Sequence, residues 1–326
     1  MDDPVGTVLA AAFPDREVDA VADPGPSWND ANRTVEVSFA DDRSPGRVFL
    51  KVTLDGGGGR RERERAVTAY VRAAGTVPVP EVVAADPEAD APHLATAPVP
   101  GRLLHRVWHD ADEERQRALA ATVGDALARI HARRFETPGH VVGGDADGLR
   151  IDGAPWPDVL RDRIELFRSL ADPVRFDHHF DAVAAAVERN RDLLTGVPAA
   201  LLHGDPAMPN CFLPPDADSG ASLGFLDWEI AHVGDPVREV RRAERQLFEP
   251  LFGEPDPRLV AAFREGYRER AGGFPAGHED RRPVYDALTY LGVSGYLEEH
   301  ATHREASREE LATAMAAEMD RLLSRI

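Results

Sequence analysis

The sequence predicts an α+β protein with two lobes, of which the first is small and rich in β-strands and the second is larger and mostly helical. Short runs that alternate apolar and polar residues fill much of the first hundred residues, whereas segments with helical spacing dominate the chain after Pro98-Val99-Pro100-Gly101. A chain of 326 residues with 43% hydrophobic residues is long enough to bury two cores. We therefore expect an N-terminal lobe over residues 1–97 and a C-terminal lobe over residues 98–326.

Four strands and one helix are expected in the N-terminal lobe. The helix should cover about residues 60–74, because Val67, Tyr70 and Val71 fall on one face at helical spacing. Turn residues separate the first two strands at positions 41–46. The expected strands are residues 34–39, 47–52, 81–85 and 93–97.

In the C-terminal lobe, helical spacing is clearest over residues 112–134, where Leu119, Val123, Leu127 and Ile130 recur on one face. A single strand-rich stretch, residues 199–229, is expected to interrupt the helices. The other expected helices lie near residues 156–171, 173–194, 236–251, 256–271, 280–300 and 304–323.

The charge and composition exclude several classes of protein. A net charge of −19 opposes nucleic-acid binding, which depends on cationic neutralisation of phosphates. No apolar run reaches the roughly 18 residues of a membrane helix. The acidic start of the chain lacks the basic region of a signal peptide, so we expect a cytoplasmic protein with no membrane partner. Abundant acid and scarce lysine indicate a halophilic origin, although a GC-rich genome gives a similar arginine bias.

Lysine occurs once in the chain, at Lys51, whereas the other 37 of the 38 basic residues are arginine. Lys51 lies in the expected strand 47–52. An ammonium and a forked guanidinium are not interchangeable where geometry is tight, and one task that requires the ammonium is contact with nucleotide phosphates. Composition alone leaves chance survival of this lysine as an equal alternative.

The most specific motif lies in the strand-rich stretch. An apolar strand leads to His203-Gly204-Asp205, Asn210 follows after four intervening residues, and a second apolar strand ends at Asp227. This spacing recurs in kinases, where the first Asp lies at the acceptor hydroxyl and the Asn and second Asp bind magnesium. Magnesium prefers such hard oxygen ligands. The run Gly56–Gly59 lacks the following Gly-Lys-Ser/Thr, which excludes a Walker P-loop.

These residues resemble the aminoglycoside phosphotransferase and choline kinase-like family over roughly residues 25–245. The resemblance is carried by His203-Gly204-Asp205 with Asn210, and by Asp227-Trp228-Glu229 with Gly234-Asp235-Pro236. Weaker matches are Asn32-Arg33-Thr34, Val77-Pro78-Val79-Pro80, Val99-Pro100-Gly101 and Leu127-Ala128-Arg129-Ile130-His131-Ala132.

The resemblance implies a bilobal protein-kinase-like fold and transfer of phosphate from ATP, with Mg²⁺, to a hydroxyl group of a small molecule. It implies that Asp205 is the catalytic base or orients the hydroxyl. Asn210 and Asp227 would be the metal ligands. The N-terminal lobe would then bind the nucleotide, and the C-terminal lobe would carry catalysis and bind the acceptor.

The same resemblance assigns nucleotide contacts to the first lobe. Lys51 would contact the phosphates and pair with an acid on the following helix, for which Glu64 fits best and Glu62 is the alternative. Asn32 would lie in a loop over the phosphates. Because Pro98 lacks a backbone donor, Ala95, Thr96 and Ala97 are the better candidates for the contact with adenine.

The sequence departs from the family at Arg238-Glu239-Val240, where Asp-Leu-Ala is common, so the support under the catalytic loop is expected to differ. His203 is expected to brace this loop, because the neighbouring Asp can do the proton transfer. Trp228 is expected to pack in the interior. The role of Glu229 stays open between a metal ligand and an acceptor of backbone hydrogen bonds.

Two other functions remain as alternatives. A metal-dependent phosphohydrolase would use His203, Asp205, Asp227 and Asp235, but it gives Lys51 no role. A catalytically inactive nucleotide-binding module is also conceivable. A protein kinase is disfavoured, because Gly234-Asp235-Pro236 follows Asp227 too closely for an activation segment. The sequence identifies neither the acceptor nor the oligomeric state.

Overall fold

The computed structural model describes residues 4–23, 32–171, 175–215, 222–249, 255–302 and 306–326. The chain divides into two compact units. The first unit comprises Met1–His109, Val141–Ile151 and Pro209–Ala231, and the second comprises Asp110–His140, Asp152–Met208 and His232–Ile326.

A five-stranded antiparallel sheet forms the main part of the first unit, with strand order β1-β2-β3-β5-β4. Alternation explains the strands: Val35, Val37 and Phe39 of β2 are buried, and the residues between them are partly exposed. The strands are β1 (Val18–Ala22), β2 (Asn32–Phe39), β3 (Arg47–Thr53), β4 (Val82–Asp86) and β5 (His93–Thr96). The four predicted strands are confirmed, and β1 was not predicted.

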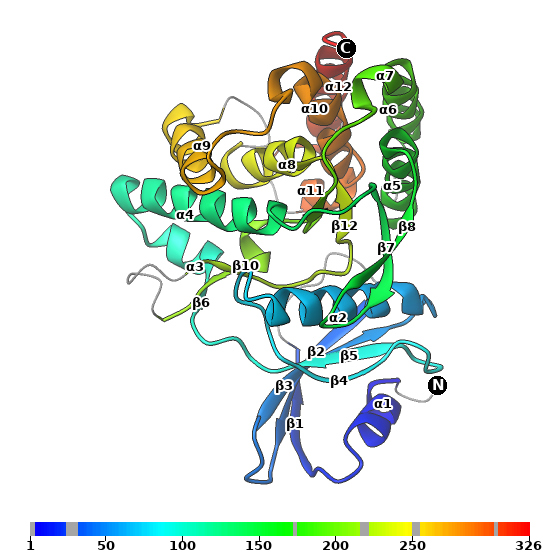
Figure 1. Ribbon diagram of the computed structural model, residues 1–326. Coiled ribbons are helices and arrows are strands. Elements are labelled where there is room, and N and C mark those ends of the chain that lie inside the picture. Colours follow the sequence, from blue (N-terminus) through cyan, green and yellow to red (C-terminus); the bar gives the residue numbers. More distant parts are fainter. Residues whose placement is uncertain (1–3, 24–31, 172–174, 216–221, 250–254, 303–305) are drawn as a thin grey trace. The chain divides into compact units, whose positions relative to one another are not determined.

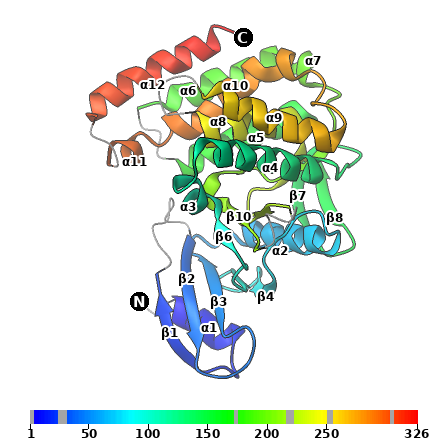
Figure 2. The ribbon, with the colours of Figure 1, turned by 90° about the vertical axis from the view of Figure 1, so that its left-hand side faces the viewer.

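Two helices accompany this sheet (Figures 1 and 2). The predicted helix is α2 (Gly58–Ala73), which packs against β4 and β5. A further helix, α1 (Pro4–Ala12), buries Val5, Val8 and Leu9 against β2 and β3. The prediction of one helix in this part of the chain was therefore wrong, because α1 has no charged face that would reveal its period.

The remaining elements of the first unit carry the second half of the motif. A three-stranded sheet has the order β11-β10-β6. The amide of Phe225 donates to the carbonyl oxygen of Pro78, which ties this sheet to the Val-Pro-Val-Pro segment. The elements are β6 (Arg102–Leu103), α3 (Leu104–His109), the short 3₁₀ helix η1 (Met208–Asn210), β10 (Cys211–Leu213) and β11 (Gly224–Phe225).

The second unit is mostly helical. Its helices are α4 (Glu113–His131), α5 (Trp156–Leu170), α6 (Asp177–Arg189), α7 (Arg191–Leu194), α8 (Pro236–Phe248), α9 (Pro257–Ala271), α10 (His278–Ser294), α11 (Leu297–Thr302) and α12 (Arg308–Leu323). Helices α4 and α9 lie side by side (Figures 1 and 2), because glycines let the backbones approach closely. A Cβ on Gly124 would lie 2.0 Å from the carbonyl oxygen of Phe263, and one on Gly266 would lie 2.0 Å from that of Ala121.

Every predicted helix after residue 98 is present, but two of them are divided. The helix expected over 173–194 is α6 and α7, which meet at Asn190, and residues 173–174 lie outside the described part of the chain. The helix expected over 280–300 is α10 and α11. None of the described helices combines the length and apolarity needed to cross a membrane.

A second strand-rich stretch contradicts the expectation of a single one. A four-stranded sheet has the order β8-β7-β12-β9. Its strands are β7 (Gly139–Gly144), β8 (Leu149–Gly153), β9 (Ala200–Leu202) and β12 (His232–Gly234). Sequence patterns missed β7 and β8 because glycines begin and end β7 and the alternation is short.

Candidate active site

Lys51 lies at the centre of a charged cluster in the first unit. Its Nζ donates to both carboxylate oxygens of Glu64 on α2, at 3.1 and 3.2 Å, and to Oδ1 of Asp227 at 2.7 Å. The lysine side chain is only 17% exposed. The alternative partner, Glu62, instead pairs with Arg65 at 2.8 Å. The structure thus brings the unique lysine together with Glu64 and Asp227.

Arg61 completes this cluster and was missed by the sequence analysis. It is fully buried, and its guanidinium contacts the carboxylates of both Glu64 and Glu229. Asn32 approaches the same Glu229, with 3.3 Å between Nδ2 and Oε2. Asn32 is the first residue of β2 and not part of a loop, and the preceding residues 24–31 lie outside the described part of the chain.

Asp227 has an unusual backbone. Its φ of 63° makes it the only non-glycine residue with a positive φ among the residues that the structure describes. Aspartate tolerates this left-handed region better than most side chains, and such residues cluster at functional sites. This conformation accompanies the contact between the Asp227 carboxylate and Lys51, directly after strand β11.

Asn210 lies beside the residue that precedes Asp227. Strand β10 pairs antiparallel with β11, so that Cys211 faces Phe225, and the carbonyl oxygen of Asn210 accepts a hydrogen bond of 2.8 Å from the amide of Leu226. The two residues that the resemblance assigned to magnesium therefore come from adjacent strand ends in one unit.

The donor atoms of this cluster fit a divalent cation. Carboxylate oxygens of Glu64, Asp227 and Glu229 all lie within 4.8 Å of one another. Three carboxylates face two cations, Lys51 and Arg61, so the cluster carries an excess of negative charge. Hard oxygen ligands and net negative charge are what Mg²⁺ requires.

Lys51 is held in its charged form. Burial alone would lower its pKa, but the carboxylates of Asp227, Glu64 and Glu229 outweigh burial and raise the pKa of Lys51 above its usual value. The side chain therefore presents a permanent ammonium at neutral pH.

The residues predicted to contact adenine lie at the end of strand β5 and directly after it. Ala95 is buried in the sheet, and Thr96 pairs with Phe49 of β3. The amide of Ala97 already donates to the carbonyl oxygen of Glu81 at 2.8 Å.

In the second unit, Glu239 supports the loop that carries Asp205. Its carboxylate accepts hydrogen bonds from the amides of His203 and Gly204, at 2.9 and 2.6 Å, and contacts Nε2 of His131 at 3.0 Å. Gly204 has a φ of +91°, a conformation that favours glycine. The residue at which the sequence departs from the family is thus the one that holds the loop.

His203 braces the same loop. Its side chain is buried, and its Nδ1 accepts a hydrogen bond of 3.2 Å from the amide of Asp205. This geometry agrees with the expectation of a structural role and not of a general base.

The Asp205 carboxylate contacts two side chains of α8. Arg242 Nη2 and Gln246 Nε2 both donate to its Oδ1, at 2.9 and 2.6 Å. Burial opposes the charge of Asp205, but Arg242 and Gln246 outweigh it and lower its pKa, so the carboxylate is ionised at neutral pH. The sequence analysis did not find these partners.

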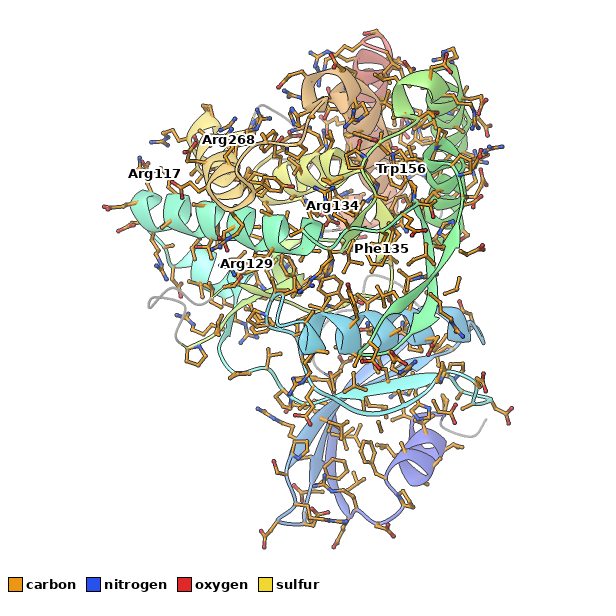
Figure 3. The ribbon with its side chains drawn as sticks, in the orientation of Figure 1. Arg117, Arg129, Arg134, Phe135, Trp156 and Arg268 are labelled. Atoms are coloured by element: carbon orange, nitrogen blue, oxygen red, sulfur yellow. The ribbon has the colours of Figure 1, made fainter. Side chains whose placement is uncertain are left out.

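Asp235 has a structural role in the second unit. Its carboxylate caps α8 by accepting from the amide of Val237, and it also accepts from Arg281 at 2.6 Å and from the hydroxyl of Tyr285 at 2.7 Å. Trp156, labelled in Figure 3 at the start of α5, donates from its indole to the same Tyr285 hydroxyl at 2.8 Å.

Most of the chain matches a known protein family. The model of the phosphotransferase enzyme family matches residues 28–274. Among curated proteins, none shows a significant sequence match.

Solved structures share the fold at low sequence identity. The GDP and kanamycin complex of APH(2″)-IIia is 13% identical, with a TM-score of 0.61 and 98% of each chain covered. A choline/ethanolamine kinase family protein from Mesorhizobium loti is 16% identical, with a TM-score of 0.56 and coverage of 98% of this chain and 95% of the other. The ADP-bound aminoglycoside phosphotransferase APH(2″)-Ib is 15% identical, with a TM-score of 0.58 and coverage of 99% and 97%. The predicted bilobal kinase-like fold class is confirmed by these neighbours.

Replacing Arg61 with Gln should destabilise the protein strongly. The substitution leaves Glu64 and Glu229 buried with one cation instead of two, and breaking a buried ion pair costs about 3–5 kcal/mol. Urea denaturation measures the change. The control is Arg65→Gln, whose half-exposed pair with Glu62 should contribute below about 1 kcal/mol. Equal losses in both variants would contradict a special role for Arg61.

Replacing Glu239 with Gln should remove part of the acid sensitivity of the fold. Burial opposes ionisation, but His131 and the loop amides lower the pKa of Glu239 to about 2. The carboxylate therefore stabilises the folded state above about pH 4.5, by about 3 kcal/mol, and this contribution is lost as the pH falls towards 2. Denaturation at pH 7 and pH 3 tests this: the difference between wild type and variant should shrink at pH 3. Glu265→Gln, on the exposed side of α9, should not show the same convergence.

Proposed function

Because the chain belongs to the phosphotransferase enzyme family, we propose that it transfers the γ-phosphoryl group of ATP to a hydroxyl group of a small molecule, with Mg²⁺ as cofactor. The observation that carries this proposal is the contact of the only lysine with both Glu64 and Asp227. A helix-borne glutamate that holds a strand-borne lysine is the arrangement with which kinases position nucleotide phosphates. Solved neighbours of this fold hold GDP, ADP or ATP, which supports a nucleotide as the phosphate donor.

The first unit would bind the nucleotide. Lys51 supplies a fixed positive charge for phosphate oxygens, and Glu64 keeps its Nζ in position. Thr96 and Ala97 remain our candidates for adenine, and because the amide of Ala97 donates to Glu81, we propose that its carbonyl oxygen makes the contact. Asn32, which contacts Glu229, would act at the edge of the phosphate region.

Asn210 and Asp227 would hold the magnesium ion, and Glu229 is a further ligand or a support for them. When bound, Mg²⁺ neutralises charge on the phosphates. Lys51 contacts all three carboxylates, and its positive charge offsets their mutual repulsion, which lets Asp227 stay beside Glu64 and Glu229.

The second unit would act on the acceptor through Asp205. The acceptor oxygen forms a bond to the γ-phosphorus while the bond from that phosphorus to the β,γ-bridging oxygen breaks, and its electron pair leaves with ADP. The hydroxyl proton passes to the Asp205 carboxylate or to solvent. Because the pKa of Asp205 is lowered, this carboxylate is a weak base, and we propose that it chiefly orients the hydroxyl.

The phosphohydrolase alternative is less well supported. It requires Asp235 as a metal ligand, but this carboxylate caps α8 and accepts from Arg281 and Tyr285. It also leaves the contacts of Lys51 without a purpose. Phosphate release without a nucleotide would favour it, whereas nucleotide binding without transfer to any hydroxyl would favour an inactive module.

Replacing Asp205 with Asn should lower kcat by about 10² or more, because the oriented hydroxyl and its proton acceptor are lost. ATP affinity should stay largely unchanged. Steady-state kinetics with an accepted hydroxyl compound, together with nucleotide titration, measure both quantities. Asp192→Asn on exposed α7 is the matched control. A variant with unchanged kcat would refute the assigned role of Asp205.

Replacing Lys51 with Arg should impair turnover although the charge is conserved. The planar guanidinium cannot reproduce contacts of one compact ammonium with Glu64 and Asp227. Measurement of kcat and of ATP affinity tests this, alongside Arg47→Lys on the same strand as a control for the exchange itself. A rate equal to that of wild type would mean that the lone lysine is incidental.

A further inference from the structure

Helix α8 concentrates positive charge in a strongly acidic protein. Its 13 residues include four arginines and two glutamates, and most of them are buried, whereas the whole chain has a net charge of −19. The arginines form two pairs at a spacing of four residues, so each pair shares one face of the helix.

One of these pairs is matched by acids. Arg241 contacts Asp286 at 2.6 Å and Glu249 at 3.0 Å. Arg245 contacts the same Glu249 at 3.1 Å and lies over the ring of Tyr290. The charges on this face of α8 are therefore compensated within the protein.

The other pair, Arg238 and Arg242, is not matched in this way. Arg238 is 1% exposed, and its Nε and Nη1 have no hydrogen-bond partner among the residues that the structure describes. Arg242 is 8% exposed and contacts Asp205, but within the same described residues its Nε also lacks a partner. The neighbouring Gln246 likewise has a buried Oε1 without a described partner.

The surrounding acids do not satisfy these donors. Glu239, next to Arg238 in the chain, accepts from two loop amides and contacts His131. Asp235 accepts from Arg281 and Tyr285. Burial and the nearby charge of Arg242 lower the pKa of Arg238 to about 10, which still leaves it charged at neutral pH.

A third arginine adds to the positive charge. The guanidinium of Arg242 lies 5.2 Å from the ring centroid of Phe167 on α5, and that of Arg163 lies 5.6 Å from the centroid of the same ring. Arg163 is 2% exposed. Arg163 and Arg242 are thus two buried guanidinium groups beside the same ring of Phe167.

A buried cation with unmade hydrogen bonds is costly, and an anionic group that reached Arg238 and Arg242 would relieve that cost. Guanidinium groups match carboxylates and phosphates better than any other ligands. We propose that Arg238 and Arg242 bind an anionic group of the acceptor, a carboxylate or a phosphate monoester, and that the enzyme phosphorylates a hydroxyl of an anionic small molecule.

This inference rests on the proposed function and narrows it. Arg242 would contact both the Asp205 carboxylate and the anionic group of the acceptor. One guanidinium would therefore position the acceptor relative to the carboxylate that orients its hydroxyl. Cationic acceptors such as aminoglycosides and amino alcohols would meet repulsion from the same arginines.

The test compares acceptors that differ in charge and little else. Gluconate is set against glucose, glycerate and glycerol 3-phosphate against glycerol, and kanamycin and ethanolamine represent cations. The kcat/KM values for ATP-dependent phosphoester formation are measured at one ionic strength, because salt screens the effect. We expect the anionic member of a pair to exceed the neutral one by about 10²-fold, the scale of one charge-assisted recognition. Comparing the carboxylates gluconate and glycerate with glycerol 3-phosphate shows which of the two anionic groups is preferred.

Variants link the preference to the arginines. Arg238→Gln should lower the ratio of kcat/KM for the anionic to the neutral member of each pair from about 10²-fold towards 1. Arg189→Gln, on the exposed end of α6, is the matched control and should keep the preference. If Arg238→Gln does not fold, the same ratio of kcat/KM for anionic and neutral acceptors is compared between the wild type and Arg238→Lys.

A binding measurement separates failure of this inference from failure of the proposed function. Thermal denaturation without nucleotide should show stabilisation of wild type by the anionic compounds over their neutral counterparts, and the difference should disappear in Arg238→Gln. Stabilisation without any phosphorylation would refute the kinase function and leave the anion site intact. A better rate with neutral or cationic acceptors, or no selective stabilisation by any anion, would overturn the inference.

Discussion

The geometry of the first unit depends on balancing buried charge. Lys51 is surrounded by carboxylates from α2 and from the segment after β11, and Arg61 is enclosed by two of the same acids. Neither cation could be buried without these acids, and the acids would repel one another without the cations. The cluster therefore joins the sheet, the helix and the segment after β11 into one rigid arrangement, and it leaves an excess of negative charge that suits a divalent cation.

The second unit uses the same physics in a different balance. Glu239 holds the loop through two amides and His131, which fixes the backbone that carries Asp205. Arg242 then connects that carboxylate to α8. Where every buried charge has a partner, the support is rigid. At Arg238 and Arg242 some donors have no partner among the described residues, and the proposed anion would accept hydrogen bonds from them.

Sequence patterns indicated residues of the candidate site where residue identity was informative. Lys51 is unique, and Asp205, Asn210 and Asp227 lie at a specific spacing at strand ends, so the proximity of Lys51, Asn210 and Asp227 within the first unit could be expected. Arg61, Arg238 and Arg242 could not be recognised, because one arginine among 37 carries little information until burial is known. Helix α1 and strands β7 and β8 were missed because their local patterns lack amphipathic contrast, and their formation depends on packing.

A chain with a solitary ε-amine carries an internal chemical reporter. Apart from the α-amino group, Lys51 is the only primary amine of the chain, and its side chain is 17% exposed and held by acids. Only the deprotonated amine reacts, so the raised pKa of Lys51 makes the folded protein resistant to such labelling. A label found on Lys51, as distinct from one on the α-amino group, therefore counts molecules in which this one ion-pair cluster has opened, without any introduced probe.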